Sequence, residues 1–269
     1  MSSAVRLDRF LSEAGVASRS GSAALVRSGR VCVDGEVTKS SKAKIEEHMV
    51  VTIDGEHIEA EQIPLLMVYN KPLGTQSTMR DNKGRQDLSA VLFETPVPWQ
   101  KVFHPVGRLD ADTSGLLLFS SRGDLTHRLL HPKRKVEKEY SLVCRPQFNR
   151  DTFMQDLKHN LAKGVPTATG KHVGHLLDVV PAKDDLVKAR VSVTEGKHRM
   201  VRRMMANLGA PVLQLRRDRF GPIPLGDLQP GDLLPVSYHD HISWAKQLLG
   251  EEPDDDYEPE EEEDDAEED

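Results

Sequence analysis

The chain has 269 residues and carries 36 Lys or Arg against 43 Asp or Glu, which gives a formal net charge of −7. At about 150 residues per domain, this length predicts two domains and excludes a miniprotein or a lone binding peptide. The apolar residues make up 38% of the chain, which is near the globular average once glycine is counted and excludes wholesale disorder.

The acidic residues are concentrated at the C-terminus. Residues 251–269 contain 15 Asp or Glu and no Lys or Arg, so residues 1–250 hold 28 acids against 36 bases. A basic body is expected of a protein that binds nucleic acid, although it also occurs without such a partner. We expect residues 249–269 to be disordered, because dense like charge with few apolar residues cannot offset the entropy of ordering. This tail either improves solubility or competes with a nucleic-acid partner for the basic body.

Cysteine usage and the N-terminus bear on the compartment. Cys32 and Cys144 form no CxxC or Cys/His cluster, so we expect two reduced thiols and no structural zinc. Charged residues interrupt the N-terminus early, and no stretch approaches the ~18 apolar residues of a membrane span. We therefore expect a cytoplasmic protein that is neither secreted nor inserted in a membrane. We also expect no metal or other cofactor, since no Walker loop, dinucleotide-binding glycine motif or metal-ligand cluster is present.

Residues 1–64 predict a small domain that ends in a polar linker at 59–63. Apolar spacing indicates two short helices that stop at Gly15 and Gly29,. Two strands follow, and each runs into an Asp-Gly turn, at 34–35 and at 54–55,. Basic side chains outnumber acids up to residue 44. This charge indicates either contacts with RNA phosphates or an ordinary solvated helix face.

Residues 65–248 predict a second domain of the α+β class. Strand-like runs at 65–69, 115–119, 140–143 and 189–193 are mixed with helix-like runs at 151–161 and 200–208,.

Three segments of this second domain could carry chemistry. Residues 104–118 place Asp110 and Asp112 in a turn before an apolar strand, although turn carboxylates often only satisfy backbone donors,. Residues 195–204 bring several cations to a helix start, which suits phosphate, although such a run is also typical of a solvent-facing helix. Tyr140 begins an alternating strand, where an aromatic residue is usually ordinary filler.

The order of the motifs resembles one known family. The first domain resembles the alpha-L RNA-binding module, which is named after the fourth small-subunit ribosomal protein. The resemblance lies in residues 6–8, 14–19, 27–31 and 33–35. Four further motifs, in this order, resemble the RsuA/RluB group of ribosomal RNA pseudouridine synthases. They are Lys-Pro-Leu-Gly at 71–74, Gly-Arg-Leu-Asp with Asp-Thr-Ser-Gly-Leu-Leu across 107–117, Glu-Lys-Glu-Tyr at 137–140, and the segment 195–204. That group carries the same module in front, so the resemblance covers about residues 5–240. It departs at Met200, where the family has Gln or Glu, so a polar contact is expected to be missing.

The resemblance implies isomerisation of a uridine in ribosomal RNA to pseudouridine, without a cofactor. It assigns Asp110 as the catalytic carboxylate, Arg202 as the cation paired with it, and Tyr140 as the aromatic face for the uracil. A carboxylate is a nucleophile only when ionised, so a buried one needs a nearby cation. The target nucleotide must also be flipped out or unpaired. Asp112 is then expected to be a turn or capping residue. Because residues two apart can face the same side, the pattern of residues alone does not exclude Asp112 as the catalytic carboxylate.

The remaining site residues follow from the same resemblance. Arg108, Lys71 and Arg203 are predicted to bind the substrate. The predicted RNA-binding residues of the first domain are Arg6, Arg9, Ser18, Arg19, Arg27, Arg30 and Lys39.

Two other functions stay open. The first is a non-enzymatic RNA chaperone or ribosome-assembly factor. The second is a metal-dependent nuclease with Asp110 and Asp112 as ligands, although these two acids lack the further ligands such a site needs. The expected partner is ribosomal RNA or a pre-ribosomal particle, the default oligomeric state is a monomer, and residues 219–225 look more like large-subunit members of the family.

Overall fold

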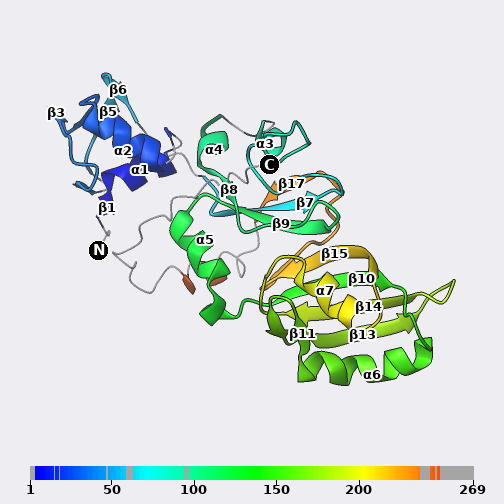
Figure 1. Ribbon diagram of the computed structural model, residues 1–269. Coiled ribbons are helices and arrows are strands. Elements are labelled where there is room, and N and C mark those ends of the chain that lie inside the picture. Colours follow the sequence, from blue (N-terminus) through cyan, green and yellow to red (C-terminus); the bar gives the residue numbers. More distant parts are fainter. Residues whose placement is uncertain are drawn as a thin grey trace.

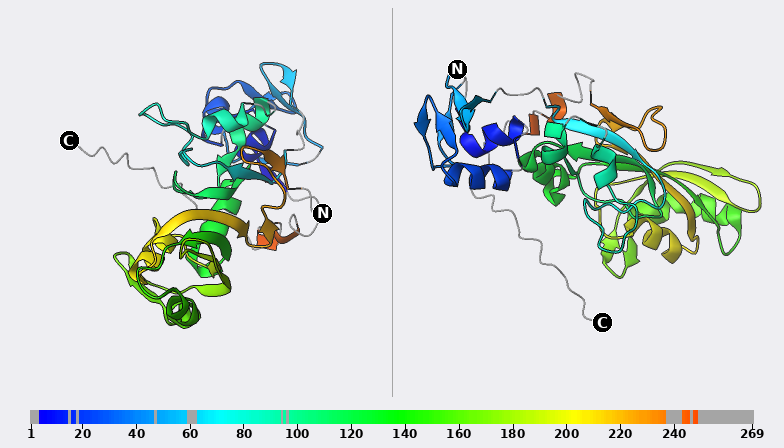
Figure 2. Two further views of the ribbon diagram at one scale, coloured as in Figure 1. Left: turned by 90° about the vertical axis from the view of Figure 1, so that its right-hand side faces the viewer. Right: turned by 90° about the horizontal axis from the view of Figure 1, so that it is seen from above.

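The computed structural model describes residues 4–14, 16–17, 19–46, 48–58, 63–93, 95, 97–236, 243–245 and 247–248. The predicted acidic tail, Ser18 and the side chain of Arg19 lie outside the described residues. The described chain forms two units, joined between the strands β6 and β7 (Figures 1 and 2).

The N-terminal unit packs a helix pair against short strands. Its helices are α1 (Leu7–Glu13) and α2 (Arg19–Arg27), and its strands are β1 (Val5–Arg6), β2 (Val31–Val33), β3 (Glu36–Val37), β4 (Lys44–Ile45), β5 (Val51–Ile53) and β6 (Glu56–His57). Four strands pair in the order β3-β2-β5-β6, and β1 pairs with β4. Leu7 and Leu11 of α1 meet Val26 of α2 and Val31 of β2 in a buried cluster. The two predicted Asp-Gly turns are confirmed, since each closes a two-residue hairpin.

The second unit is built on a nine-stranded sheet. Its main order is β13-β14-β10-β15-β9-β7-β17, with β8 beside β9 and β16 beside β15. The strands are β7 (Leu66–Lys71), β8 (His104–Pro105), β9 (Ser114–Ser120), β10 (Lys138–Cys144), β13 (His175–Pro181), β14 (Val187–Val193), β15 (Val212–Phe220), β16 (Ile223–Pro224) and β17 (Leu233–Pro235), and a separate hairpin consists of β11 (Val165–Thr167) and β12 (Gly170–His172).

Helices complete the second unit and confirm the predicted α+β class. They are α3 (Ser89–Leu92), α4 (Val97–Val102), α5 (Gly123–Leu130), a 3₁₀ turn at Pro132–Arg134, α6 (Arg150–Lys163) and α7 (Met200–Asn207). The predicted strands at 65–69, 115–119, 140–143 and 189–193 fall on β7, β9, β10 and β14, and the predicted helices at 151–161 and 200–208 fall on α6 and α7.

Two apolar clusters lie on opposite faces of the sheet, because successive strand residues point to opposite sides. Met67 and Tyr69 of β7 join the cluster under α6 and α7, whereas Leu66 and Val68 join the cluster that contains α5. The N-terminal unit lies at the end of the molecule near α4 and α5, far from α6 (Figures 1 and 2). The two units touch where Lys101 Nζ of α4 donates a hydrogen bond to the Val16 carbonyl oxygen at 3.2 Å.

The sheet is joined at its centre by a close backbone approach. Among the described strand pairs of this sheet, β9 and β15 run parallel, with Gly115 opposite Arg217, while the others are antiparallel. Gly115 has φ +101°, and a Cβ atom added to it would lie 2.3 Å from the Arg217 carbonyl oxygen. Because that oxygen belongs to the backbone, no side-chain movement relieves the clash. Glycine at this position therefore allows the two halves of the sheet to meet.

We predict that Gly115→Ala lowers the free energy of unfolding by about 3 kcal/mol or more, since backbone strain and overpacking act together. Gly123→Ala is the matched control, because a Cβ at Gly123 meets nothing within 4 Å. Urea denaturation of both variants measures the difference. Equal unfolding free energies for the two variants would contradict the packing described here.

Candidate active site

The loop that carries Asp110 lies between β8 and β9 and is clamped by the loop after β7. Ser77 Oγ donates a hydrogen bond to the Leu109 carbonyl oxygen at 2.6 Å and accepts one from Leu109 N at 3.0 Å. The amide of Gly74 donates to the Ala111 carbonyl oxygen at 2.7 Å. The backbone is thus fixed on both sides of Asp110. Sequence reasoning missed Ser77, for which no local pattern gives a signal, although the neighbouring 71–74 motif was noticed.

Asp110 has partly exposed carboxylate oxygens. Its side chain is 27% exposed, with Arg199 Nη1 and His198 Nε2 each 3.9 Å from one of its oxygens. These separations are too long for hydrogen bonds. Within the part of the chain that the structure describes, no group donates a hydrogen bond to either oxygen.

Asp112, in contrast, is held by two arginines. Arg199 donates from Nη1 and Nη2 to the two oxygens of Asp112, at 3.0 and 2.8 Å. Arg202 Nε lies 3.4 Å from Asp112 Oδ2. The hydrogen bond from Arg199 holds the pKa of the Asp112 carboxyl below its ordinary value, and the same pair raises the pKa of Arg199.

The predicted ion pair between Arg202 and Asp110 is not formed in this structure. Arg202 is largely buried, with 11% of its side chain exposed, and it donates to the carbonyl oxygens of Asp112 at 2.6 Å and Val212 at 3.1 Å. Burial lowers the pKa of Arg202, and Asp112 opposes that effect more strongly than Asp110 does. Arg202 therefore ties α7 to the loop that carries Asp110 through a hydrogen bond to the backbone of Asp112.

Lys71 is fully buried at the end of β7. Its Nζ donates to the Pro72 carbonyl oxygen at 2.9 Å. Burial lowers the pKa of Lys71 to about 8, while the charges of Asp110 and Asp112 act to raise it. Lys71 is predicted to bind the substrate, and in the structure its buried ammonium group is close enough to interact with the charges of Asp110 and Asp112,.

Tyr140 lies on the same face of the sheet as the loop that carries Asp110. Its side chain is 8% exposed and belongs to one buried cluster with Leu109. In the sheet, Tyr140 is opposite Arg217, which in turn is opposite Gly115 at the start of β9. The strand register therefore brings Tyr140 toward the segment that follows Asp110.

The other predicted substrate residues occupy different positions. Arg108 is exposed and makes no hydrogen bond or ion pair with the described residues. Arg203 Nη2 lies 3.3 Å from His198 Nδ1. Met200, the departure from the family pattern, is 3% exposed in the core under α7, so its side chain fills apolar space.

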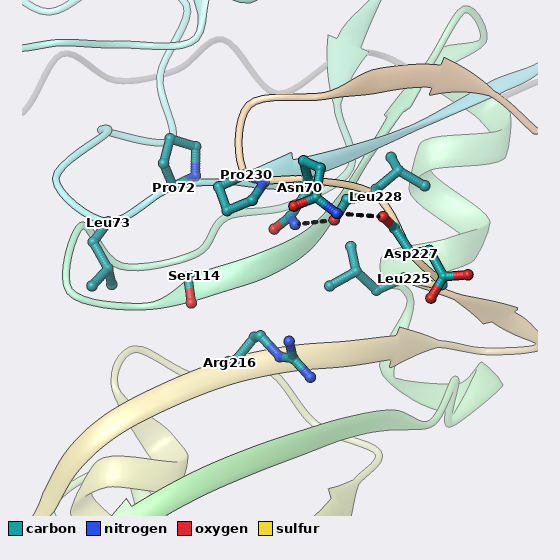
Figure 3. Close-up of a pocket in the computed structure, with 11 residues that line it drawn as sticks. Asn70, Pro72, Leu73, Ser114, Arg216, Leu225, Asp227, Leu228 and Pro230 are labelled. Carbon is teal, nitrogen blue, oxygen red and sulfur yellow. Dashed lines mark hydrogen bonds between the residues drawn. The ribbon is translucent and has the colours of Figure 1, made fainter.

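Figure 3 shows a cleft lined by residues from the end of β7, the start of β9 and β15. It has a volume of about 500 Å³, and its lining includes Asn70, Leu73, Ser114 and Arg216. Asn70 precedes Lys71 in β7 and therefore points away from the carboxylates.

The predicted RNA-binding residues of the N-terminal unit differ in their availability. Arg6 hydrogen-bonds Asp8 at 2.6 Å, and Arg30 hydrogen-bonds Asp54 at 3.0 and 3.1 Å. Burial acts to raise the pKa of Asp124 in α5, but the hydrogen bond and charge of Arg122 hold it below its ordinary value, and the charge of Arg9 adds to their effect. The exposed cations Arg27 and Lys39 make no hydrogen bond or ion pair with the described residues, so they remain open to phosphates.

Comparisons with known proteins show which family the chain belongs to. Residues 65–207 match the family described as RNA pseudouridylate synthase, and residues 5–51 match the S4 domain. An uncharacterised RNA pseudouridine synthase of Mycobacterium leprae is 36% identical over 86% of this chain and 88% of its own length. The ribosomal small subunit pseudouridine synthase A of Yersinia pestis is 33% identical over 87% of this chain and 95% of its own.

A large-subunit enzyme and a solved structure are also similar. The ribosomal large subunit pseudouridine synthase B of Bacillus subtilis is 30% identical over 87% of this chain and 93% of its own. A crystal structure of a pseudouridylate synthase is 25% identical, with a TM-score of 0.56, and the match covers 91% of this chain and 100% of that one. The chain therefore belongs to the RNA pseudouridylate synthase family, whose reaction is the isomerisation of uridine in RNA.

No helix in the described ranges is long and apolar enough to cross a membrane. No group of three or more His, Cys, Asp or Glu there could hold a metal ion.

We predict that Arg27→Met and Lys39→Met each weaken RNA binding and lower the salt dependence of the affinity by about one phosphate contact. Arg30→Met is the matched control and has a smaller effect, because a phosphate at Arg30 must compete with Asp54. Affinity titrations at several salt concentrations measure both quantities. A loss for Arg30→Met as large as for the other two would contradict this ranking.

Proposed function

We propose that this enzyme converts a specific uridine of ribosomal RNA into pseudouridine and that Asp110 is the catalytic carboxylate. The proposal is supported by its similarity to synthases of both ribosomal subunits. The main structural support is a contrast between two carboxylates. The oxygens of Asp110 accept no hydrogen bond from the described residues, whereas Arg199 donates a hydrogen bond to each oxygen of Asp112.

This contrast distinguishes the two carboxylates chemically. A nucleophile needs a free lone pair and an ionised form. Arg199, 3.9 Å away, and the buried Lys71 place positive charge near Asp110 without covering its oxygens. Asp112 is the poorer nucleophile because each of its oxygens already accepts a hydrogen bond from Arg199.

The reaction rearranges atoms within one nucleotide. The bond from ribose C1′ to uracil N1 breaks, the uracil turns, and a bond forms from C1′ to uracil C5. The proton of C5 is lost and N1 gains one, so the composition is unchanged. Asp110 acts on the sugar or the uracil, while Tyr140 supplies the aromatic face for the flipped base. The exposed Arg108 contacts a phosphate or fills the gap that flipping leaves.

The biological setting follows from this substrate. The enzyme acts as a monomer on ribosomal RNA or a pre-ribosomal particle in the cytoplasm, and its S4 domain contributes affinity through phosphate contacts. Residues 219–225 favour the large subunit as the target. Because similar synthases act on either subunit, both RNAs belong in the test.

We predict that the wild-type protein introduces one new pseudouridine into unmodified ribosomal RNA. Carbodiimide labelling followed by reverse transcription maps the modification on transcripts of both subunits, and heat-denatured protein is the control. If every uridine stays unchanged while the protein still binds RNA in a salt-sensitive way, an assembly factor explains the protein better than an enzyme of ribosomal RNA.

A further inference from the structure

We propose that Asp112 is a positioning residue, which holds Arg199 and Arg202 beside Asp110 and keeps their donors away from the Asp110 oxygens. This inference rests on the proposed function of Asp110. It gives Asp112 a role in place of the turn or capping role that the sequence predicts.

The first support is that the contacts of Asp112 connect two elements distant in the sequence. Arg199 binds both of its carboxylate oxygens, and Arg202 Nη2 binds its carbonyl oxygen at 2.6 Å. Arg202 Nη1 also binds the Val212 carbonyl oxygen at 3.1 Å, next to α7. The residue thereby ties the start of α7 to the catalytic loop. A simple turn residue would instead use its oxygens on nearby backbone amides.

The second support is the backbone of Arg199. Arg199 precedes the first turn of α7 with φ +51° and ψ +27°, in the left-handed region, and no side chain caps this helix end. A non-glycine residue keeps such a conformation only where its surroundings determine it. The paired hydrogen bonds to Asp112 are such a determinant. They direct the Arg199 guanidinium between the two carboxylates, with Asp112 as the nearer partner.

The third support is the division of charge in the site. Lys71 at the end of β7, and Arg199 and Arg202 at the start of α7, face the pair Asp110 and Asp112. His198 adds a further nitrogen near Asp110. If Asp112 were neutral, the carboxylate of Asp110 would be the charged partner left near Arg199. Closing the gap of 3.9 Å would place guanidinium donors on the oxygens that Asp110 needs for its reaction. Asp112 therefore keeps the cations near and the nucleophile free.

We predict that Asp112→Asn lowers kcat by roughly 10- to 100-fold through displacement of reacting groups, with KM unchanged. Arg199→Met lowers kcat as well, and the double variant is no slower than the slower single variant, because groups that act as a unit are not additive. Asp112→Glu restores part of the rate. The assay measures pseudouridine formed on the RNA that carries the wild-type site.

Asp151→Asn is the matched control, since Asp151 pairs with Arg150 at 3.5 Å on α6. It is expected to keep the wild-type kcat. Wild-type kcat in Asp112→Asn, or losses that multiply in the double variant, would overturn the positioning role. If Asp112→Asn lowers the RNA affinity and the melting temperature together with kcat, Asp112 has a structural role instead. An inactive wild-type protein would overturn the proposed function itself, and this inference with it.

Discussion

The close approach of Gly115 to the Arg217 carbonyl oxygen is the constraint on which the site depends. It joins the antiparallel half of the sheet that contains Tyr140 to the half that contains β7 and β9. Because β9 starts at this point, the loop that carries Asp110 must end there. The same junction places the loop after β7 where Ser77 and Gly74 can hold the backbone on both sides of Asp110. The fold therefore fixes the backbone on both sides of Asp110 through hydrogen bonds to Leu109 and Ala111.

Electrostatics then distinguish two carboxylates that are two residues apart. Lys71 approaches from inside the sheet, and Arg199 and Arg202 approach from α7. The buried lysine contributes charge with a pKa near 8, so its support weakens as the pH rises above that value. The arginines stay charged and direct their hydrogen bonds to Asp112. Asp110 receives the favourable potential of all three cations, while its own oxygens remain available for chemistry.

The sequence was sufficient where one physical signal dominated. The apolar run at 65–69 found β7, whose six residues are all buried, and the Asp-Gly pairs found both hairpins. The strand β13 was missed, because most of its side chains are exposed and give no alternation. The pairing of Arg202 could not be predicted, since a displacement of a few ångströms in α7 decides between Asp110 and Asp112. Met200 was noticed as a departure, and its burial in the core explains why an apolar side chain suits that position.

The most direct test of this account is single-turnover conversion by Asp110→Asn, with enzyme in excess over an RNA that the wild-type protein modifies. The substitution preserves the size of the side chain and removes its negative charge and nucleophilic oxygen. The account predicts that the variant binds the RNA as tightly as the wild type and forms no pseudouridine. Conversion by Asp110→Asn at the wild-type rate would contradict it, because the catalytic carboxylate would then have to be another residue.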